Sequence, residues 1–218
     1  VTGSLKFDIQ IPASIYEEGA ALRRDLGVDR PVWMAGSTRP REEASILDAL
    51  AQLKTRYPNL LLVLAPRHPE RFQEVHALCK HRGRNVQRRS RGTECEAKID
   101  ILLLDSMGEL MRFYAASDIA FVGGSLAAFG GHNVLEPAGL GIPVVTGPHL
   151  FNFSDIASKL FASGSLKVGH TIDEITDLVA GWLDDSEARD AAGRNGRRIV
   201  EANRGASKRI IALLEASL

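Results

Sequence analysis

The sequence is poor in cysteine, in aromatic residues and in long apolar runs, and neither sign of charge is in excess. Two cysteines in 218 residues, Cys79 and Cys95, are too few for a disulfide framework and lack metal-ligand spacing, which is typical of a reducing compartment. No apolar run approaches the roughly 18–20 residues of a membrane-spanning helix. Because 27 basic residues balance 27 acidic ones, no overall field attracts nucleic acid.

Several catalytic motifs are also missing. The sequence contains no DxD pair flanked by apolar strand residues, no HExxH or CxxC motif and no P-loop lysine. We therefore expect neither a bound metal nor a cofactor.

Positive charge is concentrated in one segment, KHRGRNVQRRSR, from Lys80 to Arg91. We interpret it first as a solvated surface loop and strand edge. The alternative is a patch that faces phosphate groups or a membrane.

The chain alternates short apolar segments with helical patterns. Residues 41–57 and 70–81 have apolar positions at helical spacing, and three further helices are predicted over 171–182, 186–203 and 206–217. Five segments are almost continuously apolar, as strands buried on both faces are: 31–36, 60–66, 99–105, 118–124 and 143–147. This order predicts an α/β fold with a Rossmann-like, doubly wound parallel sheet followed by C-terminal helices.

The segment FVGGSLAAFGGHNVLEPAGLGIPVVTGP, from Phe121 to Pro148, predicts a nucleotide site. We expect a strand, a glycine-rich turn, a helix that opens near His132 and a second strand. Four glycines within nine residues allow close approach to a ligand or positive φ, and the helix start suits a phosphate. Glu136, expected one turn inside the helix, suits the hydroxyls of a ribose.

This segment resembles the C-terminal half of a two-domain, GT-B glycosyltransferase, and it is most similar to 3-deoxy-D-manno-octulosonic acid (Kdo) transferases. Four further motifs resemble the same family in the same order: AGSTRPREE at 35–43, LAPRHPERF at 64–72, DSMGEL at 105–110 and NFSDI at 152–156. Together they cover roughly residues 30–165. Val134 replaces the family's usual proline, and residues 39–41 replace a His and a Gly, which leaves the contacts of that loop open.

The resemblance implies the donor-binding half of an enzyme that moves Kdo from CMP-Kdo to the lipid A precursor, with inversion, in lipopolysaccharide core synthesis. Residues 1–12 resemble an interdomain connector, and residues 13–218 resemble the C-terminal CMP-Kdo-binding domain. The N-terminal domain, which is absent here, would receive the lipid acceptor and supply the general base. No catalytic residue is therefore expected in this chain, and the whole protein would work at the cytoplasmic face of the bacterial inner membrane.

The candidate site residues follow the predicted strands, where ligands bind in such sheets. Arg67, held between two prolines of the PRHP loop, offers a rigid fork to a phosphate or a base. Met107 and Gly108 would form an apolar shelf for the base, after a helix cap made by Ser106 and Glu109. The CMP-binding candidates are Pro66, Arg67, Met107, Gly108, Glu109, Asn133, Val134, Leu135 and Glu136. Further contacts with phosphate or sugar are expected from Ser37, Gly130, Gly131 and His132, although Ser37 could instead cap a helix.

Two other interpretations remain open at this stage. One is a different GT-B protein, such as a UDP-sugar transferase or a UDP-sugar 2-epimerase. The other is a nucleotide-sensing module without catalytic activity. Binding of CMP rather than UDP separates the first from a Kdo transferase.

Overall fold

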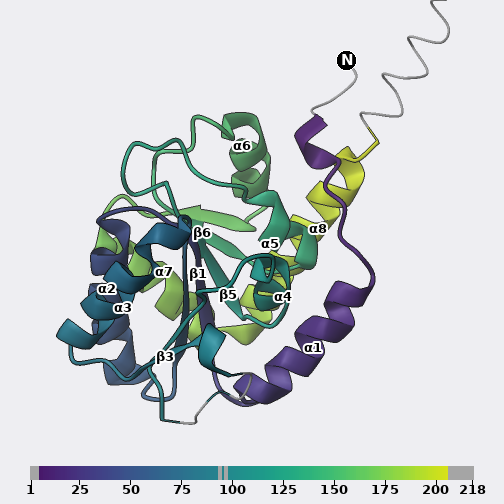
Figure 1. Cartoon of the computed structure of the whole chain (residues 1–218). Helices are drawn as coiled ribbons and strands as arrows, with labels where there is room; N and C mark the ends of the chain where they lie inside the picture. The colour runs from purple at the N-terminus through teal and green to yellow at the C-terminus, as the bar shows by residue number, and fades with distance from the viewer. Residues whose placement is uncertain (1–4, 93–94, 96–97, 206–218) are drawn as a thin grey trace, which may run out of the picture.

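A single parallel sheet organises the chain in the computed structural model, which describes residues 5–92, 95 and 98–205 (Figure 1). Its strand order is β3-β4-β2-β1-β5-β6-β7. The strands are β1 (Val32–Thr38), β2 (Leu61–Pro66), β3 (Val86–Arg88), β4 (Ile101–Leu103), β5 (Ile119–Val122), β6 (Val144–Thr146) and β7 (Leu166–Val168). The predicted α/β fold with a Rossmann-like parallel sheet is therefore confirmed.

The apolar pattern of the sequence identifies the inner strands but not the two edge strands. The five apolar segments correspond to β1, β2, β4, β5 and β6, whose residues are almost all buried. The missed strands, β3 and β7, are three residues long and lie at opposite edges of the sheet. An edge strand has one neighbour and is partly exposed, so its sequence lacks the continuous apolar run of a central strand.

Helices cover both faces of this sheet (Figure 1). On one face lie α2 (Glu42–Arg56), α3 (Phe72–His81) and α7 (Ile172–Asp184), and on the other lie α1 (Ser14–Leu26) and α4 (Leu110–Ala115). Towards β6 and β7, α5 (Leu135–Leu140), α6 (Ser154–Ala162) and α8 (Ser186–Asn203) enclose a third cluster. The short 3-10 turns are η1 (Leu5–Phe7), η2 (Pro69–Arg71) and η3 (Arg89–Arg91).

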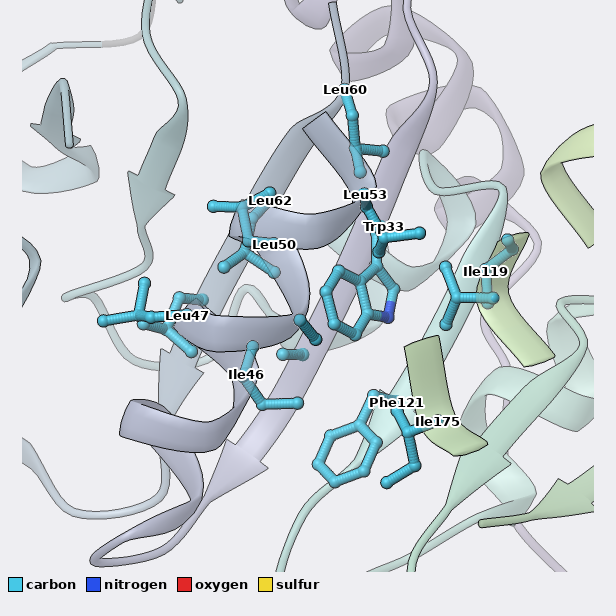
Figure 2. Packing of buried hydrophobic residues seen from close by; sticks show 14 of the residues in the cluster. Trp33, Ile46, Leu47, Leu50, Leu53, Leu60, Leu62, Ile119, Phe121 and Ile175 are labelled. Atoms are coloured by element: carbon cyan, nitrogen blue, oxygen red, sulfur yellow. The ribbon is translucent and has the colours of Figure 1, made fainter. Parts of the chain in front are cut away.

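The largest apolar cluster is centred on β1 (Figure 2). The indole of Trp33 lies between leucines of α2, including Leu50 and Leu53, and Ile119 of β5. All four side chains are at most 1% exposed. This packing holds β1 at the middle of the sheet, and the loop that follows β1 therefore starts from a rigid support.

Two helix boundaries differ from the sequence predictions. The helix after the glycine turn starts at Leu135 rather than near His132, and Glu136 is its second residue rather than one turn inside. Helix α4 starts only at Leu110, because Gly108 has a left-handed φ of 82° that ends any helix nucleated before it. Helix α1 was not predicted, and the helix expected over 206–217 lies outside the described residues.

The two helices after β7 begin at side-chain caps. Thr171 caps α7 by accepting a hydrogen bond from the N–H of Glu174 at 3.2 Å, as the sequence predicted. Asp185 does the same for α8, accepting from the N–H of Ala188 at 2.9 Å. Within the described part of the chain, no helix combines the length and the apolar character that crossing a membrane requires.

Helix α8 approaches the turn after α5 so closely that only glycine fits at the contact. A Cβ on Gly193 would lie 1.9 Å from the carbonyl oxygen of Gly141, whereas a Cβ on Gly181 of α7 would have no neighbour within 4 Å. Two glycines inside helices thus have opposite structural roles.

We expect Gly193→Ala to lower the free energy of unfolding by about 1–3 kcal/mol, because the added methyl pushes α8 away from the turn after α5. Gly181→Ala should raise it by about 0.5–1 kcal/mol, since alanine favours an open helical position. Urea denaturation of both variants measures the difference. Equal effects of the two substitutions would contradict this packing.

Candidate functional site

The motifs singled out in the sequence meet at the end of the sheet that is formed by the carboxyl ends of its strands. The loops after β1, β2, β4 and β5 all leave the carboxyl ends of parallel strands. Strand β2 lies on one side of β1, and β5, which comes later in the chain, lies on the other side. Ligands of open α/β sheets bind at such a reversal of strand order.

A buried carboxylate holds the first half of the glycine turn. Glu42, the first residue of α2, is 1% exposed and reaches across to the loop after β5. Four backbone N–H groups donate to it: those of Arg39 and Gly124 lie 2.8 and 2.7 Å from Oε2, and those of Ser125 and Leu126 lie 2.9 Å from Oε1. The carboxylate therefore fills a ring of amide donors that would otherwise suit an external anion.

The glycines serve the geometry of the turn itself, and positive φ is one of the two uses that the sequence allowed for them. Gly123 is needed because a Cβ would lie 2.5 Å from the carbonyl oxygen of Ser37. Gly130 and Gly131 have positive φ, and the N–H of Gly131 already donates to the carbonyl of Gly124 at 2.7 Å. The glycines shape the turn, and most of the amides expected to bind phosphate have internal partners.

A second buried carboxylate ties the loop after β2 to the loop after β1. Glu43, also 1% exposed, receives Arg71 on both oxygens, at 2.6 and 3.2 Å, and the hydroxyl of Thr38 at 2.9 Å. The N–H of Arg67 donates to the carbonyl of Thr38 at 3.0 Å. The position of Arg67 is thus set by the same two loops.

Five of the candidate residues line a small cavity between the loops after β1, β2 and β4. Its volume is about 80 Å³. Ser37 lines it with a strained, positive φ of 55°, and Met107 beside it is 66% exposed. The candidates that line this cavity are Ser37, Pro66, Arg67, Met107 and Gly108.

Glu109 does not line this cavity, and the predicted cap is wrong. The hydroxyl of Ser106 donates to the carboxylate of Glu109 itself rather than capping a helix, because α4 starts after both residues. The same carboxylate pairs with Arg89 at 3.2 Å and with Arg112. Its charge is therefore balanced within the protein.

Asn133 and Glu136 form a pair beside the glycine turn. The Asn133 amide nitrogen donates to Oε1 of Glu136 at 3.1 Å, and its carbonyl accepts the N–H of Leu135 at 3.1 Å. Burial raises the pKa of Glu136, while Asn133 and nearby Arg67 lower it. The side chains of Val134 and Leu135 are fully buried, so these two candidates can offer a ligand only backbone atoms.

Arginine and histidine side chains from three loops converge next to this pair. The Nε of Arg39 donates to Nε2 of His132 at 3.2 Å, its NH1 contacts Nε2 of His68, and its guanidinium lies 5.0 Å from the ring centre of Phe129. Burial, followed by the charges of Arg39, Arg67 and His68, lowers the pKa of His132 to about 4. The two arginine charges in this cluster suit an anion.

The sequence analysis missed three residues of this site. Arg39 was noted only as a departure from a family pattern, and Glu42 and Glu43 only as letters of the AGSTRPREE motif. Two adjacent carboxylates at the start of a helix suggest the usual favourable interaction with the helix dipole. Their burial and their partners across the sheet are not visible in the sequence.

We expect Glu42→Gln to lower the free energy of unfolding by about 2 kcal/mol or more, because an amide NH₂ replaces one accepting oxygen and leaves two buried N–H groups without acceptors. Chemical denaturation measures this change. Glu18→Gln, an exposed residue of α1, is the matched control and should be neutral. A stability of Glu42→Gln equal to that of the control would refute the clamp.

The low pKa of His132 predicts a pH dependence of stability. The unfolded chain takes up this proton near pH 6.5, whereas the folded chain takes it up only near pH 4. Between these values the unfolded state binds more protons, so the free energy of unfolding falls as the pH falls. His132→Asn should make this fall shallower, and an NMR titration of the His132 ring should show a midpoint near 4. A midpoint near 6.5 would contradict the cluster geometry.

Comparison with known proteins adds an independent finding. Residues 44–199 match the family model described as glycosyl transferases group 1. The chain is 42% identical to the 3-deoxy-D-manno-octulosonic acid transferase of Haemophilus influenzae, across all of this chain and 51% of that protein. It is 38% identical to the same-named protein of Bordetella pertussis, across 99% of this chain and 51% of that one.

A solved structure resembles the fold closely. The C-terminal CMP-Kdo binding domain of WaaA from Acinetobacter baumannii superposes with a TM-score of 0.81 and 34% identity, covering 87% of this chain and 99% of that one. The resemblance that the five motifs indicated is confirmed. The chain spans about half the length of the curated relatives it matches.

Proposed function

Because this chain belongs to the glycosyl transferases group 1 family, among the Kdo transferases, we propose that it supplies the donor-binding half of an enzyme that transfers Kdo from CMP-Kdo to the lipid A precursor. The observation that carries the proposal is the convergence of a neutral histidine, two arginines and a half-buried carboxylate at the reversal of strand order. An acceptor domain, present in the whole protein, completes the cleft.

Each part of the donor has a matching group in this site. The cytosine lies over the cavity beside Met107 and Gly108, and the ribose hydroxyls donate to Glu136. The phosphate is held by Arg67 and the cluster of Arg39 and His132. The charges support this division. The guanidinium groups of Arg39 and Arg67 favour a bound anion, and the desolvated carboxylate of Glu136 favours hydrogen-bond donors.

The chemistry assigned to this half is stabilisation of the leaving group. In the transfer, an acceptor hydroxyl forms the new bond to the anomeric carbon, the bond from that carbon to the CMP phosphate breaks, and the electron pair departs with CMP. Fixed cationic donors lower the free energy of the charge that develops on the phosphate. The proton of the acceptor hydroxyl passes to a base on the acceptor domain, at the cytoplasmic face of the inner membrane.

A UDP-sugar enzyme and a nucleotide sensor are the rival functions. UDP carries a second phosphate, so a UDP site needs anion-binding groups for two phosphates. The amides of the glycine turn, which would be the natural second set, are held by Glu42. This occupancy favours a nucleoside monophosphate donor such as CMP-Kdo.

Calorimetry with CMP, UMP, UDP and ADP tests the proposal. We expect CMP to bind most tightly, and Glu136→Gln to weaken CMP by about 1–3 kcal/mol, the range for a hydrogen bond to a charged group. Glu187→Gln, exposed on α8, is the matched control and should bind as the unmodified chain does. Preference for UDP, or an unchanged affinity of a folded Glu136→Gln, would overturn the donor assignment.

An activity assay of the purified chain distinguishes a half-enzyme from a complete one. Incubated with CMP-Kdo and the lipid acceptor, the 218-residue chain should transfer no sugar, and adding the N-terminal half should restore turnover. Robust turnover by this chain alone would show that the base lies within it.

A further inference from the structure

A basic groove runs along the edge strand β3, separate from the site described above. Its volume is about 540 Å³, and it shares no lining residue with the cavity beside Met107. Its walls come from α3, from β3 with η3, and from the connection that leads to β4. Five lining residues are basic, namely His76, Lys80, Arg88, Arg91 and Lys98, and none of the lining residues is acidic.

Most of this positive charge is uncompensated. Arg88 pairs at 2.5 Å with Asp105, whose side chain is buried and also accepts the N–H and hydroxyl of Ser90. Among the residues that the structure describes, the side chains of Lys80, Arg91 and Lys98 contact no carboxylate and make no hydrogen bond. Within the described part of the chain, Lys80, Arg91 and Lys98 thus bring cations from three elements to the groove without a carboxylate partner.

The repulsion within the groove has a measurable consequence. Burial, and then the charges of Arg88, Lys80 and Arg91, lower the pKa of His76, while Asp105 raises it. The like charges are thus close enough to His76 to disfavour its charged form. An anion bound between them would remove this repulsion.

Protection of the sheet edge is the competing explanation. Charged residues on an edge strand prevent other strands from pairing with it, and β3 is such a strand. However, Lys80 lies on α3 and Lys98 on the connection to β4, so neither belongs to the strand that would need protection. Edge protection therefore does not account for their position at the groove.

We propose that this groove is a second anion site, which binds a ligand with at least two phosphate charges through Lys80, Arg91 and Lys98. Phosphate is the chemistry that such a set of lysine and arginine side chains recognises. A soluble polyphosphorylated molecule and the headgroups of anionic lipids both carry it.

Pyrophosphate is the probe for the soluble ligand. Added to the 218-residue chain at saturating CMP, it should shift the backbone amide NMR signals of residues 85–91 and leave those of residues 66–68 unchanged. Lys80→Gln with Arg91→Gln should weaken pyrophosphate binding about tenfold or more, because two charge-assisted contacts are lost. The matched control is Arg194→Gln with Arg198→Gln, which removes the same charge from the exposed face of α8 and should change binding by less than about twofold.

Vesicles identify the source of the phosphate. Sedimentation with phosphatidylglycerol vesicles that is lost in Lys80→Gln/Arg91→Gln, but not in the α8 control, assigns the groove to lipid headgroups. Pyrophosphate binding without sedimentation assigns it to a soluble ligand. Arg67→Ala, which removes a donor-site cation, should leave both measurements unchanged, so a failure of the donor assignment does not affect this result.

Two outcomes would overturn the proposal. In the first, the groove variant and the α8 control bind pyrophosphate and vesicles equally. In the second, the groove variant aggregates while its remaining soluble fraction binds pyrophosphate as the unmodified chain does, which would make edge protection the role of these charges.

Discussion

One buried carboxylate joins the two loops between which the sheet reverses its strand order. A carboxylate taken out of water costs several kcal/mol unless its oxygens are fully hydrogen-bonded. Glu42 meets this condition with four backbone N–H groups drawn from the loops after β1 and β5. Each loop is thereby fixed relative to the other, and the rest of the site is built on their shared position.

This constraint determines how the cleft can hold an anion. Since Glu42 and internal carbonyl groups occupy most amides of the glycine turn, the positive charge available to a ligand comes from side chains. Arg39 and Arg67 carry like charge beside the neutral His132, and the nearby Glu136 is desolvated with one amide partner. A ligand that carries both a phosphate and hydroxyl donors would relieve both unfavourable conditions, as the proposed nucleotide donor does.

The sequence predicted much of the fold because a buried strand has a recognisable run of apolar residues. A strand covered on both faces is apolar throughout, so β1, β2 and β5 were recognised, and the ends of these strands located the motifs. The edge strands β3 and β7 were missed because partly exposed strands lack such an apolar run. The cap expected at Ser106 failed because one glycine, Gly108, takes a left-handed conformation and delays the helix.

The sequence by itself determined the family, the inner strands of the sheet and the motifs that follow them. Only the tertiary structure decided what those residues do there. Adjacent glutamates at a helix start look alike, yet Glu42 clamps the glycine turn and Glu43 binds Arg71. Partners that are more than 80 positions apart in the chain, as Glu42 and Gly124 are, leave no pattern in either neighbourhood. Hydrogen bonding and charge depend on distances in space, which are set only when the sheet brings its loops together.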